Sequence, residues 1–388
     1  MLNLRADAPR TADAVVVGGG FAGAMTAAAL VARGFGRVVV LEQEAVPGFH
    51  GSGRNAAIAR RVAEHPAVSA LAARSLALMR DLRTPAGDPV LRETGGVLLG
   101  PGDRLAQLRA AIPDVTPESR ALSAEAELVP LKSLRADWPW LDAPADFAAL
   151  VTRSCGVVDI HALLQAALAP LRGVAASLHL KTSLTAVHRS RASAITAVET
   201  SDGTIATPLL INAAGSGVNR LARLAGARPL NFRPVRRHLL TTAPHDVLPA
   251  DGPWFWDLGR GFYLRRERAG LLLCACDETP WPDHLPDDPP RDPAIRELVA
   301  ARFTAALPEL PPPAIARDWA GLRILTPDHA FALGPDPSVT GFFWVAGLGG
   351  HGMTTSCGVG ELAADLLTGA SPPPALVAAF DPGRPALV

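Results

Sequence analysis

The first sixty residues alternate between short runs of β-branched residues and one alanine-rich apolar segment. Residues 13–17 and 37–41 are such runs, and each predicts a strand buried on both faces within a parallel sheet. Between them, residues 24–33 are rich in Ala, Leu and Met and end before Gly34, which predicts a helix. A strand, a helix and a second strand in this order predict the start of an α/β fold.

Glycines connect the first predicted strand to the helix with the spacing G-x-G-x-x-G. Gly18 permits a tight turn, Gly20 lets backbone N–H groups approach a pyrophosphate, and Gly23 lets the helix pack closely on the strand. Glu42 ends the second strand, nineteen residues after Gly23, where a carboxylate can accept hydrogen bonds from a ribose. These features predict a dinucleotide site without distinguishing NAD from FAD.

The remaining hydrophobic pattern mixes strands and helices rather than repeating one unit. The acidic, proline-rich stretch 280–293 predicts a surface loop, which is either an inert connector or a lid over a pocket. The other predicted elements are a helix at 161–171 and strands at 96–100, 186–187, 209–211, 237–242 and 271–276.

The segment after Glu42 distinguishes the two cofactors. NAD-type Rossmann domains normally continue directly into the next strand, whereas residues 48–57 form a Gly/Ser-rich loop that we expect to enter a second helix. Such a loop offers further phosphate-binding amides. Two more blocks follow, a strand and turn at 209–215 and a glycine-rich run at 341–353. In this order the four blocks resemble the D-amino-acid oxidase family of FAD-dependent oxidoreductases, and the likeness covers nearly the whole chain.

The resemblance implies a Rossmann-like FAD-binding domain of the glutathione-reductase type, discontinuous in sequence, and an α+β substrate domain with a mixed antiparallel sheet. The likeness is closest to the D-arginine dehydrogenase branch, on residues 234–237, 319–323 and 341–345. The FAD-binding domain is expected at residues 1–84, 150–228 and 325–388, and the substrate domain at 85–149 and 229–324.

The resemblance also implies which residues contact the cofactor. We expect FAD to bind non-covalently, because the branch that tethers its flavin uses a cysteine shortly before a Thr-Pro-Asp segment, and residues 321–325 hold none. The expected contacts lie in the glycine motif, the 48–57 loop and three later blocks. They are Gly18, Gly20, Gly23, Glu42, His50, Ser52, Gly53, Asn55, Ala56, Val187, Gly215, Gly349, Gly350, Gly352, Met353 and Thr354.

Four side chains are candidates for handling the substrate. Oxidation of an α-amino acid needs a grip on the carboxylate, and the planar fork of an arginine binds a carboxylate through two hydrogen bonds. The resemblance gives this role to Arg323, with Arg237 as a second candidate and Arg236 as the alternative to Arg237. The only tyrosine, Tyr263, matches a substrate-facing tyrosine or is a half-buried strand aromatic. His351 lies among the flavin-binding glycines, where it contacts substrate or flavin or is a packed polar side chain.

The expected reaction is oxidative deamination of a D-amino acid to an imino acid and then a 2-oxo acid. No lysine follows Lys181, so the oxygen-activating lysine of the sarcosine-oxidase branch is missing, which slightly favours a dehydrogenase over an oxidase. A guanidinium substrate lacks an acidic partner, because its expected position reads Thr-Gly-Gly at 94–96. The aromatic stretch 254–256 suggests an apolar or aromatic substrate side chain. Arg60 and Arg61, expected in the helix after the loop, suggest an acidic one instead.

Other functions remain open at this point. The same fold and carboxylate grip would serve the oxidation of a secondary amine, glycine or a 2-hydroxy acid. A flavin-binding subunit of a heteromeric dehydrogenase is an alternative of a different class. A flavin monooxygenase is disfavoured, because its C-terminal motif usually carries Gly-Asp and residues 349–351 read Gly-Gly-His. The electron acceptor is unknown, and a quinone, an electron carrier or O₂ would each suit.

Composition narrows the partners and the location. The 388 residues carry 37 basic and 37 acidic side chains, so the net charge of zero gives no electrostatic footprint for nucleic acid. The four cysteines are too scattered for a disulfide framework or a metal site, and Cys274 and Cys276 are expected to be buried on one side of a strand. The uncharged stretch 14–32 reaches the length of a membrane span, but four glycines interrupt it. We therefore expect no integral membrane segment and a cytoplasmic protein, with peripheral membrane attachment left open.

Overall fold

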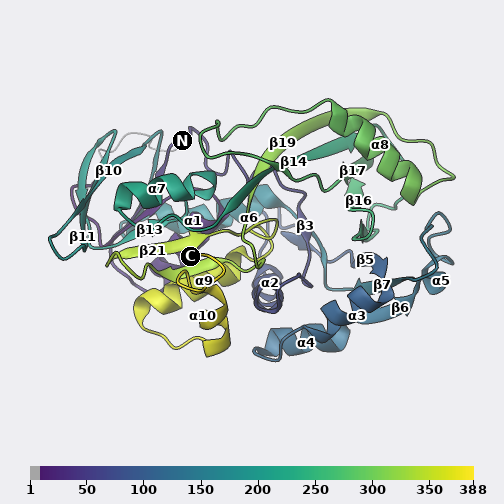
Figure 1. Cartoon of the computed structure of the whole chain (residues 1–388), viewed down its shortest axis with the longest axis horizontal. Coiled ribbons are helices and arrows are strands. Elements are labelled where there is room, and N and C mark those ends of the chain that lie inside the picture. Colours follow the sequence, from purple (N-terminus) through teal and green to yellow (C-terminus); the bar gives the residue numbers. More distant parts are fainter. Residues whose placement is uncertain (1–8) are drawn as a thin grey trace.

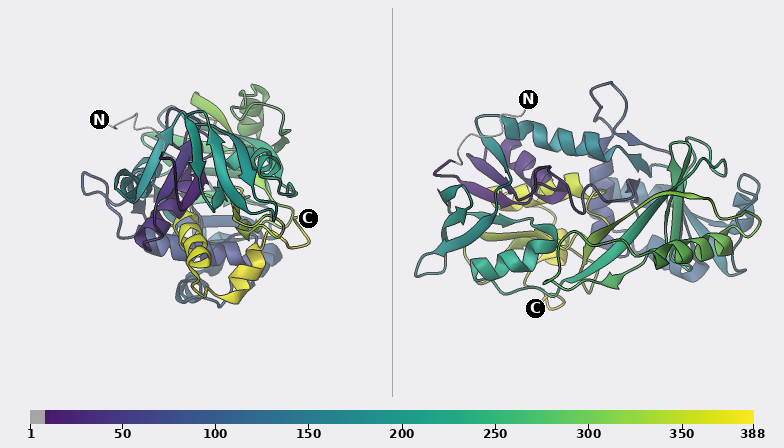
Figure 2. Two further views of the ribbon diagram at one scale, coloured as in Figure 1. Left: turned by 90° about the vertical axis from the view of Figure 1, so that its left-hand side faces the viewer. Right: turned by 90° about the horizontal axis from the view of Figure 1, so that it is seen from above.

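The computed structural model describes residues 9–388 and contains two large β-sheets arranged along the long axis of the molecule (Figures 1 and 2). The first has six strands in the order β20-β21-β13-β1-β2-β9. All neighbours are parallel except β20, which lies antiparallel to β21 at the edge. The strands are β1 (Ala14–Val17), β2 (Val38–Glu42), β9 (Ala176–Leu180), β13 (Leu210–Asn212), β20 (Ala332–Pro335) and β21 (Phe342–Ala346).

Both faces of this sheet are covered, as the β-branched runs predict. Val16 and Val40 face a core formed with helices, whereas Val15 and Val39 face a second core on the other side. The helices of the first side are α1 (Phe21–Ala32), α2 (Pro66–Met79), α6 (Ile160–Leu168), α9 (Ser356–Thr368) and α10 (Pro374–Phe380). The second side is covered by α7 (Val218–Ala225) and by a small antiparallel sheet of β10 (Leu184–Arg189), β11 (Ile195–Thr200) and β12 (Gly203–Ala206).

The second large sheet has nine strands in the order β18-β14-β17-β16-β15-β5-β7-β6, with β19 paired to β14. It is mixed, because β15 and β5 are parallel and the other pairs are antiparallel. The strands are β5 (Gly96–Pro101), β6 (Glu127–Pro130), β7 (Phe147–Thr152), β14 (Arg233–Thr242), β15 (Trp254–Asp257), β16 (Phe262–Glu267), β17 (Gly270–Cys274), β18 (Thr279–Pro280) and β19 (Ile315–Leu325).

The two faces of the nine-stranded sheet have different neighbours. One face packs on α8 (Ala294–Ala306), which buries Val299 and Phe303 against it. The opposite face carries Tyr263 and packs on Ile58 and Val62, close to the first sheet. The remaining elements are α3 (Gly102–Ala110), α4 (Pro117–Glu125), α5 (Leu131–Leu134), two 3₁₀ turns (Ala169–Arg172 and Gly215–Gly217) and a small sheet of β3 (Ile58–Ala59), β4 (Leu91–Arg92) and β8 (Gly156–Val158).

This architecture confirms the predicted fold class, a Rossmann-like nucleotide domain joined to a domain with a mixed, largely antiparallel sheet. The division of the chain into alternating FAD-binding and substrate segments stays a prediction. Strands β7 and β19 each cross one of the boundaries expected between those segments.

Two local predictions were wrong. The loop at 48–57 does not enter a helix but leads through turns to β3. Helix α2 begins only at Pro66, and the side chain of its N-cap residue, His65, accepts the Ala67 N–H. Arg60 and Arg61 therefore lie in the connection between β3 and α2. The strand expected at 271–276 ends at Cys274, because the chain turns into a left-handed conformation at Cys276, where φ is 47°.

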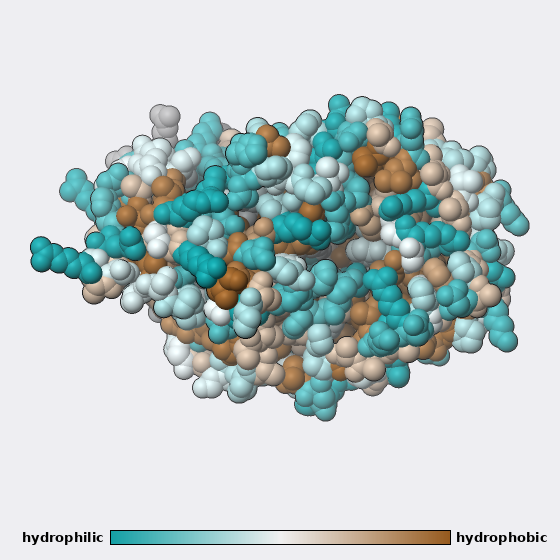
Figure 3. Space-filling model, viewed as in Figure 1, coloured by the Kyte–Doolittle hydropathy of each residue, from teal (hydrophilic) through white to brown (hydrophobic). Residues whose placement is uncertain are grey.

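The apolar character of the helices and of the surface bears on membrane association. No helix within residues 9–388 is both long and apolar enough to cross a membrane. The face seen in Figure 3 is mostly hydrophilic, and its apolar side chains occur in separate patches.

Candidate cofactor and substrate site

The glycine motif forms a turn that larger residues could not adopt. Gly18 has φ of 113°, and a Cβ there would lie 2.3 Å from the Ala213 carbonyl oxygen. A Cβ on Gly23 would lie 1.9 Å from the Gly18 oxygen, so its absence lets α1 approach β1 closely, as expected. Gly20 is the N-cap of α1 and supplies no side-chain cap. The first turn of α1 therefore keeps N–H groups available for an anion.

Glu42 connects the end of β2 to the glycine turn. Its Oε2 accepts the Gly19 N–H at 2.8 Å and its Oε1 accepts the Glu44 N–H at 2.9 Å. Each carboxylate oxygen retains a further acceptor position, and the residue lines the cavity described below. The arrangement leaves Glu42 able to accept a hydrogen bond from a ribose.

The 48–57 loop folds against the glycine turn. Ser52 Oγ accepts the Phe21 N–H at 2.9 Å, and Asn55 holds the loop by donating to the Ser52 carbonyl at 2.5 Å and accepting the Ala57 N–H at 2.7 Å. His50 Nε2 lies 3.0 Å from Glu44 Oε1, while the buried Nδ1 has no partner among the described residues. A buried, unpaired ring nitrogen beside the cavity fits a polar ligand there.

These segments enclose a cavity of about 390 Å³. A Cβ on Gly215 or Gly350 would meet no atom within 4 Å, so both glycines border open space that a side chain would fill. Such a cradle of glycines and free amides fits a flavin dinucleotide. The predicted residues that line the cavity are Gly18, Gly20, Glu42, His50, Ser52, Asn55, Gly215, Gly349, Gly350, Gly352, Met353 and Arg323.

Five expected cofactor contacts lie outside this lining. Gly23 serves helix packing, Gly53 borders a neighbouring cavity, and Thr354 Oγ1 donates to the Ile58 carbonyl at 3.0 Å. The other two are Ala56 and Val187.

Several lining residues had not been identified from the sequence. They include Gln43, Thr182, Ser183, Leu184, Ala214, Ser216, Gly217, Arg220, Asp287 and Gly347. Those at 182–184 follow β9, which neighbours β2 in the parallel sheet. The rule that ligands bind beyond the carboxyl ends of parallel strands could have found them.

Arg323 faces the cavity from the end of β19 without an acidic partner. Its guanidinium donates to the main-chain oxygens of Leu322 at 3.0 Å and Arg54 at 2.8 Å. No carboxylate in the described part of the chain lies within ion-pair distance of it, although the residue is only 7% exposed. Burial lowers the pKa of Arg323, so the charged form is stabilised poorly by its surroundings.

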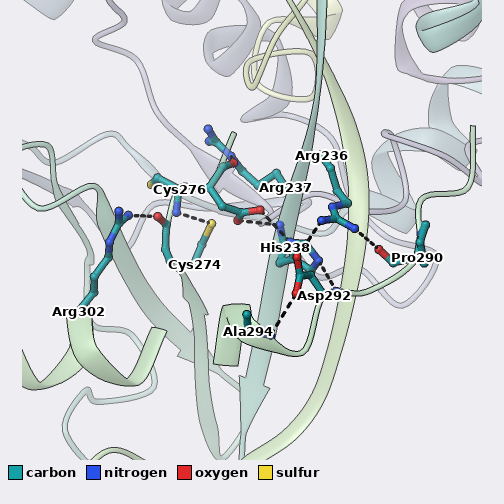
Figure 4. A network of polar contacts seen from close by, with 11 residues as sticks. Arg236, Arg237, His238, Cys274, Cys276, Pro290, Asp292, Ala294 and Arg302 are labelled. Carbon is teal, nitrogen blue, oxygen red and sulfur yellow. Dashed lines mark hydrogen bonds and ion pairs between the residues drawn. The ribbon is translucent and has the colours of Figure 1, made fainter. Parts of the chain in front are cut away.

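Arg237 and Arg236 differ from Arg323 in having acidic partners. The guanidinium of Arg237 lies 2.7 Å from Glu278 Oε1 and donates to the Asp277 carbonyl at 3.1 Å. Arg236 pairs with Asp292 at 2.9 Å and so is directed toward the loop that precedes α8 (Figure 4).

Tyr263 is buried on the face of the nine-stranded sheet that looks toward the nucleotide domain. Its ring centroid lies 4.6 Å from that of the half-buried Trp256, which in turn lies 4.7 Å below the Arg60 guanidinium. Burial, followed by the neighbouring Cys274 and Cys276, raises the pKa of Tyr263 well above its ordinary value. The hydroxyl therefore stays protonated and can donate a hydrogen bond.

His351 contacts an ion pair rather than the cavity lining. Its Nε2 lies 3.5 Å from Glu64 Oε2, and Glu64 Oε1 lies 2.8 Å from Arg60. Burial alone would raise the pKa of Glu64, but Arg60 and His351 outweigh it and hold that pKa well below its usual range. The Glu64 carboxylate therefore holds the side chains of Arg60 and His351 in place.

The acidic segment 281–293 crosses from one half of the molecule to the other. Its carboxylates pair with arginines of α7, of the 48–57 loop and of β14. The pairs are Asp283–Arg223, Asp287–Arg220, Asp288–Arg54 and Asp292–Arg236.

Comparison with known proteins agrees with this geometry. A glycine oxidase from Pseudomonas putida is 29% identical over 380 residues, which span 92% of this chain and 95% of the relative. A D-amino acid dehydrogenase from Paramagnetospirillum magneticum is 29% identical over 175 residues, which span 45% of this chain and 40% of the relative. Among solved structures, L-proline dehydrogenase from P. horikoshii aligns with a TM-score of 0.82 and 22% identity over 97% of this chain and 98% of the other.

The fold and cavity define a dinucleotide-binding flavoprotein with a separate substrate sheet. The family model described as FAD dependent oxidoreductase (DAO) matches residues 13–366, and the chain belongs to that family. It is accordingly a FAD-dependent oxidoreductase acting on amino acids or amines.

Proposed function

We propose that the chain catalyses the FAD-dependent oxidative deamination of a D-amino acid with a neutral or apolar side chain. When bound, FAD accepts the hydride that leaves the substrate Cα. The resulting imino acid hydrolyses to a 2-oxo acid and ammonia. The protein's own residues bind the substrate carboxylate and hold the Cα in position beside the cofactor site.

The observation that carries this proposal is the pairing of the buried arginines. Among the described residues, Arg323 is the one arginine below a tenth exposure that has no carboxylate partner. A buried guanidinium without an anion is costly, so a carboxylate supplied by the substrate completes the site. The other four, which each have a carboxylate oxygen at 2.7–2.9 Å, are Arg60, Arg61, Arg237 and Arg265.

The same pairing supports a neutral substrate side chain. Arg60 is neutralised by Glu64 and Arg61 by Glu125, so neither offers free positive charge to an acidic side chain. Trp256 is half-buried beside Tyr263 and presents an aromatic surface on the side of the sheet that faces the nucleotide domain. Aromatic surface of this kind favours apolar groups.

Glycine and secondary amines form the second candidate substrate class. The glycine oxidase relative matches over nearly the whole length of both chains, and Arg323 would bind the carboxylate of glycine equally well. We slightly favour a dehydrogenase over an oxidase, because no lysine follows Lys181.

The test is the visible spectrum of the FAD-loaded protein without oxygen. A panel would contain D- and L-amino acids, glycine, sarcosine, L-proline and a 2-hydroxy acid. Bleaching by a neutral D-amino acid, but not its L-form, is the expected result, and readmitting air then shows whether O₂ is the acceptor. Bleaching by glycine or a secondary amine alone would transfer the proposal to that class. A flavin that no compound reduces would favour a non-catalytic subunit.

A further inference from the structure

Two cysteines stand close together where β17 ends. Cys274 is the last residue of β17, is fully buried and pairs with Tyr263 of β16 across the sheet. Cys276 follows two residues later in a left-handed conformation and is partly exposed. Figure 4 shows both side chains between Arg302 and Arg237.

The backbone turn places the Cys274 sulfur against the main chain of Cys276. The Cys276 N–H donates to Cys274 Sγ at 3.2 Å. Because the Cys274 sulfur already lies at the Cys276 N–H, closing the bond requires the Cys276 side chain to turn toward that sulfur.

Arginines hold the turn and favour negative charge on it. Arg302 donates to the carbonyls of Ala275 and, at 2.6 Å, Gly261, and so fixes the turn between the cysteines. Burial by itself would raise the pKa of Cys274, but the hydrogen bond from Cys276 and the charge of Arg237 outweigh it and lower that pKa to about 7. Cys276, which donates that hydrogen bond, has its pKa raised. Cys274 is therefore the thiolate of the pair.

We propose that Cys274 and Cys276 form an oxidisable dithiol that reacts with hydrogen peroxide to give an intrachain disulfide. The Cys274 thiolate attacks one peroxide oxygen, the O–O bond breaks, and a sulfenic acid and hydroxide form. The Cys276 thiol then attacks the Cys274 sulfur, and the sulfenic oxygen leaves as water. In total, two thiols are oxidised and one peroxide is reduced to two waters.

The other two cysteines lack these features. Cys155 is as fully buried as Cys274, but there burial outweighs the neighbouring charges and raises the pKa. Burial raises the pKa of Cys357 to about 12. Because the thiolate is the reactive form, peroxide should select the Cys274–Cys276 pair over both.

The experiment treats the FAD-loaded full chain with hydrogen peroxide, blocks remaining thiols with an alkylating reagent and maps the peptides by mass spectrometry. The expected result is loss of alkylation at Cys274 and Cys276 together, a peptide lighter by two hydrogens, and full reversal by dithiothreitol. Alkylation of both residues after treatment, oxidation of Cys357 before them, or disulfides between chains would overturn the proposal.

Variants separate the two chemical steps. Cys276→Ser should stop at a sulfenic acid on Cys274, which dimedone captures, whereas Cys357→Ser should form the disulfide like the wild type. The dimedone adduct on Cys274 should also form more slowly at acidic pH, because the thiolate is protonated there. A Cys276→Ser protein that gives no adduct at Cys274 contradicts the mechanism. If that variant does not fold, the wild-type peptide map still decides the question.

Discussion

Replacing Arg323 by methionine tests the reasoning about the unpaired guanidinium most directly. Methionine fills a similar apolar volume but removes the charge and all donors. The two hydrogen bonds that a guanidinium fork makes to a carboxylate are charge-assisted and contribute about 1.5–3 kcal/mol each. Their loss should lower kcat/KM by roughly 10²–10⁴-fold, at about 1.4 kcal/mol per factor of ten.

The same substitution should have little effect on stability. The carbonyls of Leu322 and Arg54 lose their donors, which destabilises the fold. Removing a buried charge that has no anion offsets that loss, so the free energy of unfolding should change by no more than about 1 kcal/mol. FAD content should stay close to the wild-type level, because the glycine turn is untouched and the 48–57 loop loses only the donor to its Arg54 carbonyl.

Arg61→Met is the matched control, since Arg61 is equally buried but pairs with Glu125 at 2.9 Å. Removing Arg61 leaves a partly buried carboxylate unpaired and should lower the free energy of unfolding by about 3 kcal/mol. Its kcat/KM per bound FAD should stay close to that of the wild type. Urea unfolding and steady-state kinetics on the two variants measure both quantities. The reasoning is refuted if Arg323→Met keeps its kcat/KM, or if it loses stability as Arg61→Met does.

Three further predictions concern the cofactor and the ion pairs. Acid precipitation should release all of the flavin into the supernatant, because no cysteine occurs at 321–325 to tether it; yellow pellets would contradict this. Gly350→Val should fold normally yet lose FAD, since its Cβ would enter open cavity space, and absorbance and thermal unfolding check the two effects. The Glu64 pKa is held below 4.5, so its pairing stabilises the fold above that pH and is lost as pH falls through the folded pKa. Glu64→Gln should therefore be less stable than the wild type in urea at neutral pH, and the difference should shrink below about pH 4.

The features that the sequence predicted correctly are local ones. The turn at Gly18 and the close packing at Gly23 depend on residues a few positions apart, and the continuous β-branched runs in 13–17 and 37–41 report burial on two faces directly. The resemblance to the family added two correct predictions, the fold and the position of Arg323 at the cavity. The absence of an acidic partner for Arg323 could not be predicted, because it depends on the packing of the whole chain around that side chain.

The wrong predictions also arise because the outcome depends on how the whole chain packs. Nothing in residues 58–64 forbids the helix expected after the loop, but His65 and Pro66 provide a stronger start, and the chain first pairs as β3. Arg60 and Arg61 offer no free charge to a substrate, because Glu64 and Glu125 lie beside them. Glu125 is sixty-four residues after Arg61 in the sequence, so this pairing depends on the fold. Charge that looks available in a sequence is often already neutralised in the fold.

The difference between available and already neutralised charge matters most in the segment 281–293. Asp288 binds the guanidinium of Arg54, and the Arg54 carbonyl binds Arg323, so the segment connects through one residue to the arginine that we propose binds the substrate carboxylate. Asp287 pairs with Arg220 at the cavity lining, which attaches the segment to the nucleotide domain as well. An inert connector requires no such pairs. In each of the four pairs one side chain is at least 37% exposed, so water screens the pair, and each pair contributes about 1 kcal/mol. The pairs to Arg220 and Arg54 are contacts that a lid over the cavity would make, and the lid stays a prediction.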